Sequence, residues 1–391
     1  MNVVDNVSVI VPSYNTLGHL KNTYQSIRKY YPTIEVIMID DASEDGTADW
    51  MRSLNDDNLI CWYGEERLGH THYYDEGVKQ TNKQIITILH SDMIVGPHYF
   101  ENMLKHIKPQ TVVCSTRVEP PIHPEGPEKI IKDFGDEHYN FKWDKFNQFC
   151  LDEQPKQKDK TTTGIFAPWM LYKEDYLQVG HDQGFAPYGY EDSDIFNRWI
   201  LNGFKMVQSR DAFVYHMTCR GHRWNGGVGI ENSDYKETMN RGQRHFIRKW
   251  NQWIQNDPYM MPIIYPKYDT CLVLENLTDM NLLHQLELWA NHVHVDNESL
   301  LENYIVSEQP RTKINLRQRI TCGDYDLTKH DVYIILDCQK ITQEDFQNLT
   351  RINLILQEMD DGEDVTGKYV IGNIHIQINR LKNILKDLIK C

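Results

Sequence analysis

Short apolar runs alternate with amphipathic stretches, and this alternation fixes the fold class of the first part of the chain. Val7–Val11, Glu35–Ile39 and Gln84–Leu89 are apolar at nearly every position, which is typical of parallel strands buried on both faces. Leu17–Lys29 and Thr47–Leu54 have the periodicity of helices between those strands. This order predicts βαβ units, and therefore an α/β fold with a doubly wound, mostly parallel, Rossmann-like sheet.

Polar residues follow three of the predicted strands, at the sheet edge where ligands of such folds bind. Asp41 could accept hydrogen bonds from a ribose or a base, or it could simply form the turn before the next helix. Asp92 could ligate Mg²⁺ or Mn²⁺, or it could cap a helix over Pro97–Ile107. The complete set of these polar residues is Ser13-Tyr14-Asn15, Asp40-Asp41 and His90-Ser91-Asp92.

Two later features carry further candidate chemistry. Glu191-Asp192-Ser193-Asp194 places three acids at the start of a predicted helix. They could favour the helix dipole, or one carboxylate could act as a general base toward a hydroxyl group. His216 ends a predicted strand over Phe213–His216, where a neutral imidazole could complete a Mn²⁺ shell or serve only the structure.

A glycine-containing segment follows His216 and carries several cations. Arg220, His222, Arg223 and Trp224 lie beside Asn225-Gly226-Gly227. The composition favours a mobile, cationic lid over phosphate groups, and the alternative is a flexible surface loop.

The composition changes near residue 260, which divides the chain into two predicted domains. Residues 1–258 would form the larger α/β domain, and residues 259–391 a smaller α/β domain that binds acceptor or mediates oligomerisation. The tail over 381–390, LKNILKDLIK, is predicted to be a basic amphipathic helix that packs or mediates self-association.

Charge, cysteine content and hydropathy exclude several classes of protein. The net charge is 41 − 56 = −15, so general binding to a nucleic-acid backbone is disfavoured, although a local basic groove stays open. The 8 cysteines form no C-x-x-C pair, which argues against a zinc protein and a thioredoxin-like protein, and their low density favours reduced thiols. The chain shows no signal peptide and no apolar run of about 20 residues, so we expect a soluble, cytoplasmic protein.

The order of the motifs resembles glycosyltransferase family 2, the inverting, nucleotide-sugar-dependent enzymes of GT-A fold. The resemblance spans about residues 5–255 and rests on VSVIVPSYN, IMIDDASEDGT, LHSDM, GYEDSDIFNRWILNG and VYH. No P-loop, G-x-G-x-x-G or G-x-S-x-G motif points to another class of enzyme.

The resemblance implies roles for individual residues. It implies that Asp192 is the catalytic base with Glu191 beside it, and that Asp92 and His216 hold Mn²⁺ or Mg²⁺. His90 replaces the first acid of the usual D-x-D motif, so it would contact ribose or add a metal ligand. The stretch 163–169 resembles the strand before the acceptor pocket. The expected nucleotide and donor contacts are Pro12, Tyr14, Asp41, His90, Ser91, Arg220 and Trp224.

The function implied by the resemblance is transfer of a sugar to a hydroxyl acceptor. The region around Glu191 also resembles galactosyl and N-acetylgalactosaminyl transferases, which favours a UDP-hexose or UDP-N-acetylhexosamine donor. The acceptor could be a glycan, a protein, a small molecule or a modified nucleic-acid base. Two alternatives remain at this point: a metal-dependent nucleotidyltransferase, and a non-catalytic module that binds a nucleotide sugar.

Overall fold

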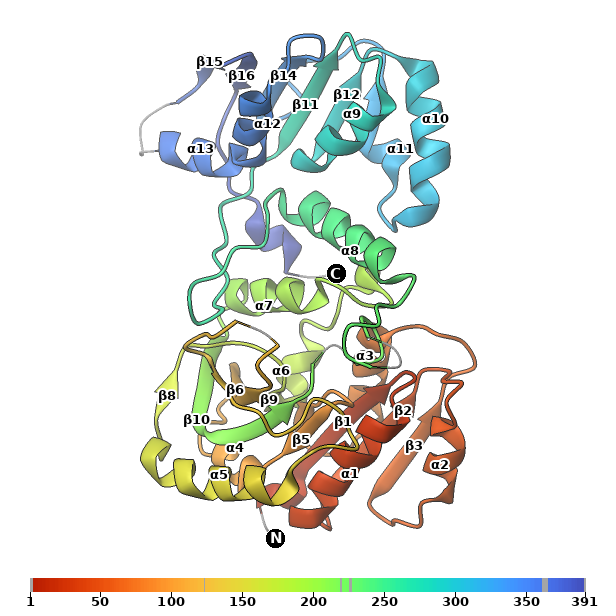
Figure 1. Cartoon of the computed structure of the whole chain (residues 1–391). Helices are drawn as coiled ribbons and strands as arrows, with labels where there is room; N and C mark the ends of the chain where they lie inside the picture. Colours follow the sequence, from red (N-terminus) through yellow and green to blue (C-terminus); the bar gives the residue numbers. More distant parts are fainter. Residues whose placement is uncertain (1–2, 123, 219, 225–226, 361–364, 390–391) are drawn as a thin grey trace. The chain divides into compact units, whose positions relative to one another are not determined.

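The computed structural model describes residues 3–122, 124–218, 220–224, 227–360 and 365–389, and it forms two compact units (Figure 1). The first contains Met1–Thr238 and Asn256–Pro262, and the second contains Met239–Gln255 and Ile263–Lys390. This division differs from the expected boundary at 258/259, because most of helix α8 (Tyr235–Trp250) groups with the second unit.

The first unit is built on a ten-stranded, mostly parallel sheet, which confirms the expected fold class. Strands β1, β2, β3 and β4 pair in parallel, as do β6, β7 and β10. The antiparallel strands β5, β8 and β9 were not predicted. The strands are β1 (Val7–Ser13), β2 (Glu35–Asp40), β3 (Leu59–Tyr63), β4 (Ile85–Ile88), β5 (Met93–Val95), β6 (Thr111–Glu119), β7 (Lys129–Ile131), β8 (Thr161–Thr162), β9 (Trp169–Tyr172) and β10 (Lys205–His216).

Helices cover both faces of this sheet, as the alternation of side chains along β1 requires. Val9 and Val11 join the apolar core that contains Leu20 of α1, whereas Ile10 joins the core that contains Tyr74 of α3 and Trp199 of α7. The sheet is therefore doubly wound. The helices of this unit are α1 (Leu17–Tyr30), α2 (Thr47–Ser53), α3 (His70–Gln80), α4 (Tyr99–Leu104), α5 (Trp143–Gln157), α6 (Lys173–Leu177) and α7 (Glu191–Leu201).

The second unit is a smaller α/β domain, as expected, with strand order β13-β12-β11-β14-β16-β15. β11 lies between β12 and β14 and is parallel to both. Its strands are β11 (Thr270–Glu275), β12 (His292–Val295), β13 (Ile320–Cys322), β14 (Val332–Asp337), β15 (Gly367–Ile371) and β16 (Ile374–Ile378). Its helices besides α8 are α9 (Met280–Leu286), α10 (Glu298–Glu308), α11 (Leu316–Arg319), α12 (Gln343–Thr350) and α13 (Ile352–Met359).

The predicted amphipathic helix in the C-terminal tail is wrong over the described residues. Only Leu385–Leu388 form a short 3₁₀ turn, and residues 381–384 have no regular structure. Asn383 accepts backbone hydrogen bonds from Lys267 and Leu385, and its own side chain therefore competes with helix formation. Across the part of the chain that the structure describes, no helix has both the length and the apolarity needed to cross a membrane.

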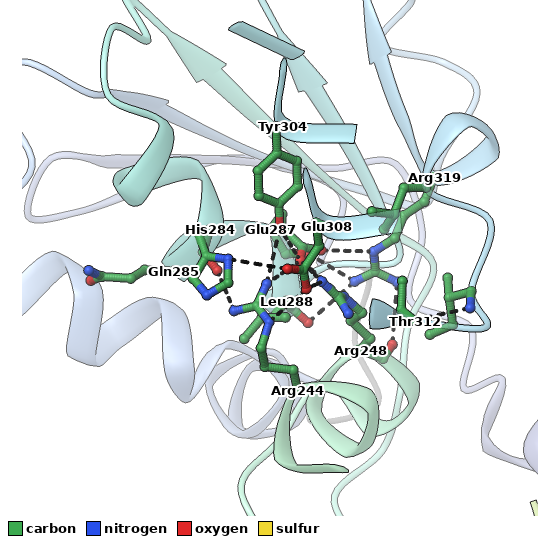
Figure 2. Close-up of polar contacts among 12 residues, drawn as sticks. Arg244, Arg248, His284, Gln285, Glu287, Leu288, Tyr304, Glu308, Thr312 and Arg319 are labelled. Carbon is green, nitrogen blue, oxygen red and sulfur yellow. Dashed lines mark hydrogen bonds and ion pairs between the residues drawn. The ribbon is translucent and has the colours of Figure 1, made fainter. Parts of the chain in front are cut away.

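A buried ionic cluster organises the second unit (Figure 2). Glu287 is fully buried, and its Oε1 lies 2.9 Å from Arg244 Nη2 and 2.5 Å from Arg248 Nη2. Glu308 Oε1 contacts the same two arginines at 2.9 and 2.6 Å, and Arg319 lies 3.4 Å from Glu287. Burial alone would raise the pKa of Glu287, but the arginines outweigh that effect and lower it to about 2.

We predict that Glu287→Gln destabilises the second unit by about 3–5 kcal/mol, because it leaves buried guanidinium groups without their shared counter-charge. Urea-induced unfolding of the full chain measures this loss. Since the folded pKa of Glu287 is lowered, its contribution is present at neutral pH and disappears as the pH falls from about 4 toward 2.

Glu302→Gln is the matched control, because Glu302 also pairs with an arginine, Arg317, at 2.7 Å but on the surface. Solvent screens that pair, so the unfolding free energy should stay nearly unchanged. Equal losses for the two variants would contradict the special role of the buried cluster.

Candidate active site

One pocket of the first unit collects residues that lie at or just after the ends of parallel strands. Because β1, β2 and β4 are parallel neighbours, their carboxyl ends open onto the same edge of the sheet. The expected residues that line this pocket are Pro12, Tyr14, Asp41, His90, Ser91, Asp92 and Arg220.

Asp41 holds the loop that leads from β3 into α3. Its two carboxylate oxygens accept hydrogen bonds from the backbone N–H groups of Leu68 and Gly69, at 2.8 and 3.0 Å. Gly69 has a φ of +90°, and a Cβ atom there would lie 2.1 Å from the carbonyl oxygen of Pro187. Burial raises the pKa of Asp41 to about 6, although these hydrogen bonds oppose the shift. Asp41 thus shapes the wall of the pocket.

Asp92 and His216 come together through the pairing of two strands. His216 of β10 lies opposite Met93 of β5, which places it beside Asp92, and the Nε2–Oδ1 distance is 3.6 Å. His90 joins them, and the candidate ligand atoms of the three side chains all lie within 4.8 Å of one another. The geometry therefore brings His90 into the predicted Asp92–His216 pair.

These residues fit a divalent cation. Burial lowers the pKa of His90 to about 3, so its imidazole is neutral, as a metal ligand must be. Burial would raise the pKa of Asp92, but its other surroundings, of which His216 contributes most, outweigh burial and lower that pKa. Glu119 holds His216 Nδ1 at 3.0 Å and leaves Nε2 facing Asp92, the outer-sphere arrangement common for metal-binding histidines. Two nitrogen donors favour Mn²⁺ over Mg²⁺.

Glu191 and Asp192 open helix α7 and differ in their surroundings. Glu191 is buried, and its Oε1 lies 2.5 Å from His70 Nε2. Burial would raise the pKa of Glu191, but the charge of His70 dominates and lowers it. Burial, together with the charge of Glu191, raises the pKa of Asp192. Two adjacent carboxyl groups whose pKa values are driven apart form a typical pair for acid–base chemistry.

Neither of these two acids belongs to the described lining of the pocket, although both lie close to it. His70 does line the pocket, and its ion pair connects Glu191 to that wall. Besides burial, the charges that affect the pKa of Asp192 most are those of Glu191, His70, Arg117 and His216. Asp192 therefore lies in the same electrostatic environment as the candidate metal ligands.

Arg220 lies at the base of the predicted lid. Its backbone N–H donates to Asp92 Oδ2 at 3.3 Å, and its guanidinium pairs with Glu137 at 3.3 Å. Trp224 packs 5.3 Å from that guanidinium and lines an adjoining pocket rather than the main one. Asn225 and Gly226 of the predicted lid lie outside the described residues.

Sequence reasoning missed Arg67 and His70, which line the pocket together with Tyr188 of the aromatic segment 184–190. The guanidinium of Arg67 lies 3.9 Å from the centre of the Tyr14 ring and 5.3 Å from that of Tyr188. Arg67 and His70 follow β3, so the strand-end rule that selected Asp41 and Asp92 would have found them.

His216 lines a second hollow, of about 600 Å³, and is not part of the lining of the main pocket. His216 and Glu119 line it together with Phe166, whose ring lies 3.7 Å from the Arg117 guanidinium. The expected strand over 163–169 is wrong, because residues 163–168 form a loop and the strand begins at Trp169. That loop carries Phe166 to the hollow.

Comparison with known proteins adds a family to this geometry. The profile of glycosyl transferase family 2 matches residues 8–178, and that of the N-terminal domain of galactosyltransferase matches residues 153–221. Together the two profiles span residues 8–221, and this part of the chain is similar to glycosyltransferases. Its doubly wound sheet and strand-end pocket agree with the GT-A fold implied by the motifs.

Individual relatives of the chain are distant. A validoxylamine A glucosyltransferase of Streptomyces hygroscopicus subsp. jinggangensis is 25% identical over 287 residues, which cover 66% of this chain and 63% of the relative. An undecaprenyl-phosphate mannosyltransferase of Micrococcus luteus is 25% identical over 29% of this chain and 49% of its own length. The chain thus spans less than two thirds of these relatives.

One solved structure similar to the chain is that of GalNAc-T7 with UDP, GalNAc and Mn²⁺, at a TM-score of 0.44 and 15% identity. The match covers 63% of this chain and 48% of the GalNAc-T7 chain. A mannosyltransferase of Pyrobaculum calidifontis in complex with GDP-Man and Mn²⁺ has a TM-score of 0.42 and is 17% identical. The match covers 66% of this chain and 67% of the mannosyltransferase chain.

We predict that Asp92→Asn weakens Mn²⁺ binding at least about 10-fold, because it removes the one anionic ligand of the cluster with His90 and His216. Glu119→Gln, which leaves all three ligands in place, should weaken binding less. Isothermal titration of the full chain with MnCl₂ measures both effects.

Asp49→Asn is the control, since Asp49 is a carboxylate whose side chain is 88% exposed on α2. Mn²⁺ affinity should match that of the unaltered protein. An Asp92→Asn variant with unchanged Mn²⁺ affinity would remove Asp92 from the metal site.

Proposed function

We propose that the first unit is an inverting glycosyltransferase that moves a hexosyl group from a nucleotide sugar, with UDP as the nucleotide, to a hydroxyl acceptor. One observation carries this proposal. Asp41, the His90–Asp92–His216 cluster and the Glu191–His70 pair meet around one pocket at the carboxyl edge of the sheet. The family match and the relatives named for glucosyl and mannosyl transfer support it.

The donor nucleotide would lie on the wall made by Tyr14, Asp41 and Arg67. Asp41 is anchored by backbone N–H groups, so its free lone pairs point in a fixed direction toward a ribose or base. Arg67 and Arg220 would neutralise phosphate charge at this wall. The expected contacts of Pro12, His90 and Ser91 belong to the same proposal.

His90, Asp92 and His216 would hold the divalent cation, with Mn²⁺ as the favoured ion. When bound, that cation would neutralise the diphosphate leaving group. Glu119 would keep His216 in one tautomer and one orientation, because its carboxylate fixes the proton on Nδ1.

Asp192 would act as the general base. Its raised pKa makes it a stronger base than an ordinary aspartate, while Glu191 stays ionised against His70. Asp192 would take the proton of the acceptor hydroxyl as that oxygen attacks the anomeric carbon from the face opposite the diphosphate. One displacement of this kind inverts the anomeric centre.

The acceptor would enter through the hollow lined by Phe166 and His216. The ring of Phe166 offers an apolar face, and Arg117, Glu119, Glu128 and Lys129 offer polar contacts suited to a polyhydroxyl molecule. A glycan or a sugar-like small molecule fits this lining, whereas the overall charge of −15 disfavours a nucleic-acid acceptor.

A panel of nucleotide sugars tests the reaction class. We expect release of UDP from a UDP-hexose or UDP-N-acetylhexosamine with MnCl₂, and loss of that release when a chelator is added. Chromatography of the nucleotide products measures it. Pyrophosphate as the product would indicate a nucleotidyltransferase, and no turnover of any donor would indicate a binding module.

Asp192→Asn tests the general base. We expect turnover to fall about 10²–10⁴-fold while donor binding is retained, because only proton transfer is lost. In the unaltered protein the rate should rise with pH, with a midpoint above the ordinary aspartate range near about 4, since the base must lose its proton to act. Bound metal would move this midpoint downward.

Ser193→Ala is the matched control, because it alters the next position of the same helical turn without touching either acid. Its turnover and pH profile should equal those of the unaltered protein. Near-normal turnover of Asp192→Asn would reject Asp192 as the base.

A further inference from the structure

Three side chains from distant parts of the sequence meet at one edge of the second unit's sheet. Asp269 directly precedes β11, His292 is the first residue of β12, and His330 lies two residues before β14. Because β11 lies between β12 and β14 and is parallel to both, the amino ends of all three strands share an edge. The topology itself therefore brings these residues together.

Their geometry is that of a cluster with one carboxylate at its centre. His330 Nδ1 lies 3.0 Å from Asp269 Oδ2, and His292 Nε2 lies 3.6 Å from Asp269 Oδ1. The two imidazole rings stack with centroids 4.3 Å apart and planes 27° apart. The three candidate ligand atoms all lie within 4.8 Å of one another. Each histidine thus turns one nitrogen toward a different oxygen of the same carboxylate.

The cluster is accessible from solvent. The side chains of Asp269, His292 and His330 are 27%, 42% and 21% exposed, so an ion can reach them without any opening of the core. The three side chains would leave further coordination positions to water, as in zinc sites with three protein ligands.

The nearby cations have partners of their own. Lys267 is buried, and its Nζ donates a hydrogen bond to the backbone carbonyl oxygen of Lys249. Arg319 faces Glu287 and backbone carbonyls of the buried cluster.

We propose that the second unit binds a zinc ion through Asp269, His292 and His330. Two imidazole nitrogens and one carboxylate oxygen suit Zn²⁺, whereas Mg²⁺ and Ca²⁺ prefer oxygen ligands throughout. The ion would link the amino ends of β11, β12 and β14, so its binding would stabilise the folded unit. This site is independent of the donor pocket and does not rest on the proposed sugar transfer.

The test first removes metal from the full chain with a chelator and then dialyses the protein to equilibrium against ZnCl₂. Elemental analysis then measures the zinc that is bound. We expect the His292→Gln/His330→Gln variant to bind one equivalent fewer than the unaltered protein. Zinc held by the His90–Asp92–His216 cluster is retained in both proteins, so it cancels in the difference. His375→Gln is the control, because His375 is an exposed histidine on β16 of the same unit. It should bind as many equivalents as the unaltered protein.

A second variant and a second measurement guard against misfolding. Asp269→Asn keeps the size of the side chain and should also lose one equivalent, with the circular dichroism spectrum unchanged. Saturating ZnCl₂ should raise the thermal midpoint of the unaltered protein more than that of either variant. Equal zinc content in all four proteins, or an equal thermal shift, would overturn the proposal and leave Asp269 as a hydrogen-bond partner of His330 with His292 beside it.

Discussion

Carboxylates buried at the ends of parallel strands are the constraint on which the candidate active site depends. An ionised group taken out of water costs several kcal/mol unless a partner compensates it. Backbone N–H groups compensate Asp41, and imidazoles surround Asp92. Arg117 and Lys129 pair with Glu119. The same holds for Glu191 at the start of helix α7, which pairs with His70. Each of these partners comes from another segment of the chain and holds that segment in place. The need to compensate buried charges therefore also determines the shape of the pocket.

Histidines of the same site take different charge states because their partners differ. The charge of Glu191 overcomes the burial of His70 and raises its pKa, so His70 is the cation that keeps Glu191 ionised. Burial dominates for His90 and His222 and lowers their pKa values to about 3 and about 4. A positive charge therefore lies at the Glu191 end of the pocket, and neutral imidazoles lie at the Asp92 end, where a metal ion needs them.

The apolar runs of the first 100 residues predicted their strands within a few residues, because β1, β2 and β4 are buried on both faces and have no competing periodicity. The antiparallel strand β9 between β4 and β6 could not be predicted, since sheet order depends on tertiary pairing and not on local pattern. The strand-end rule found Asp41 and Asp92. The ion pairs of His70 and Glu119 join residues 121 and 97 positions apart, and no local signal marks them.

Parallel sheets give their two edges opposite electrostatic character. In a βα unit the helix starts at the carboxyl edge, where its free N–H groups carry partial positive charge, and it returns its C-terminal carbonyls to the amino edge. The partial positive charge at the carboxyl edge favours phosphate groups, which agrees with the pocket beside the start of α3. The carbonyl groups at the amino edge favour cations. His292 lies at this edge, three residues after the turn that ends at Trp289. The proposed phosphate site therefore lies at the carboxyl edge of the first unit's sheet, and the proposed zinc site lies at the amino edge of the second unit's sheet.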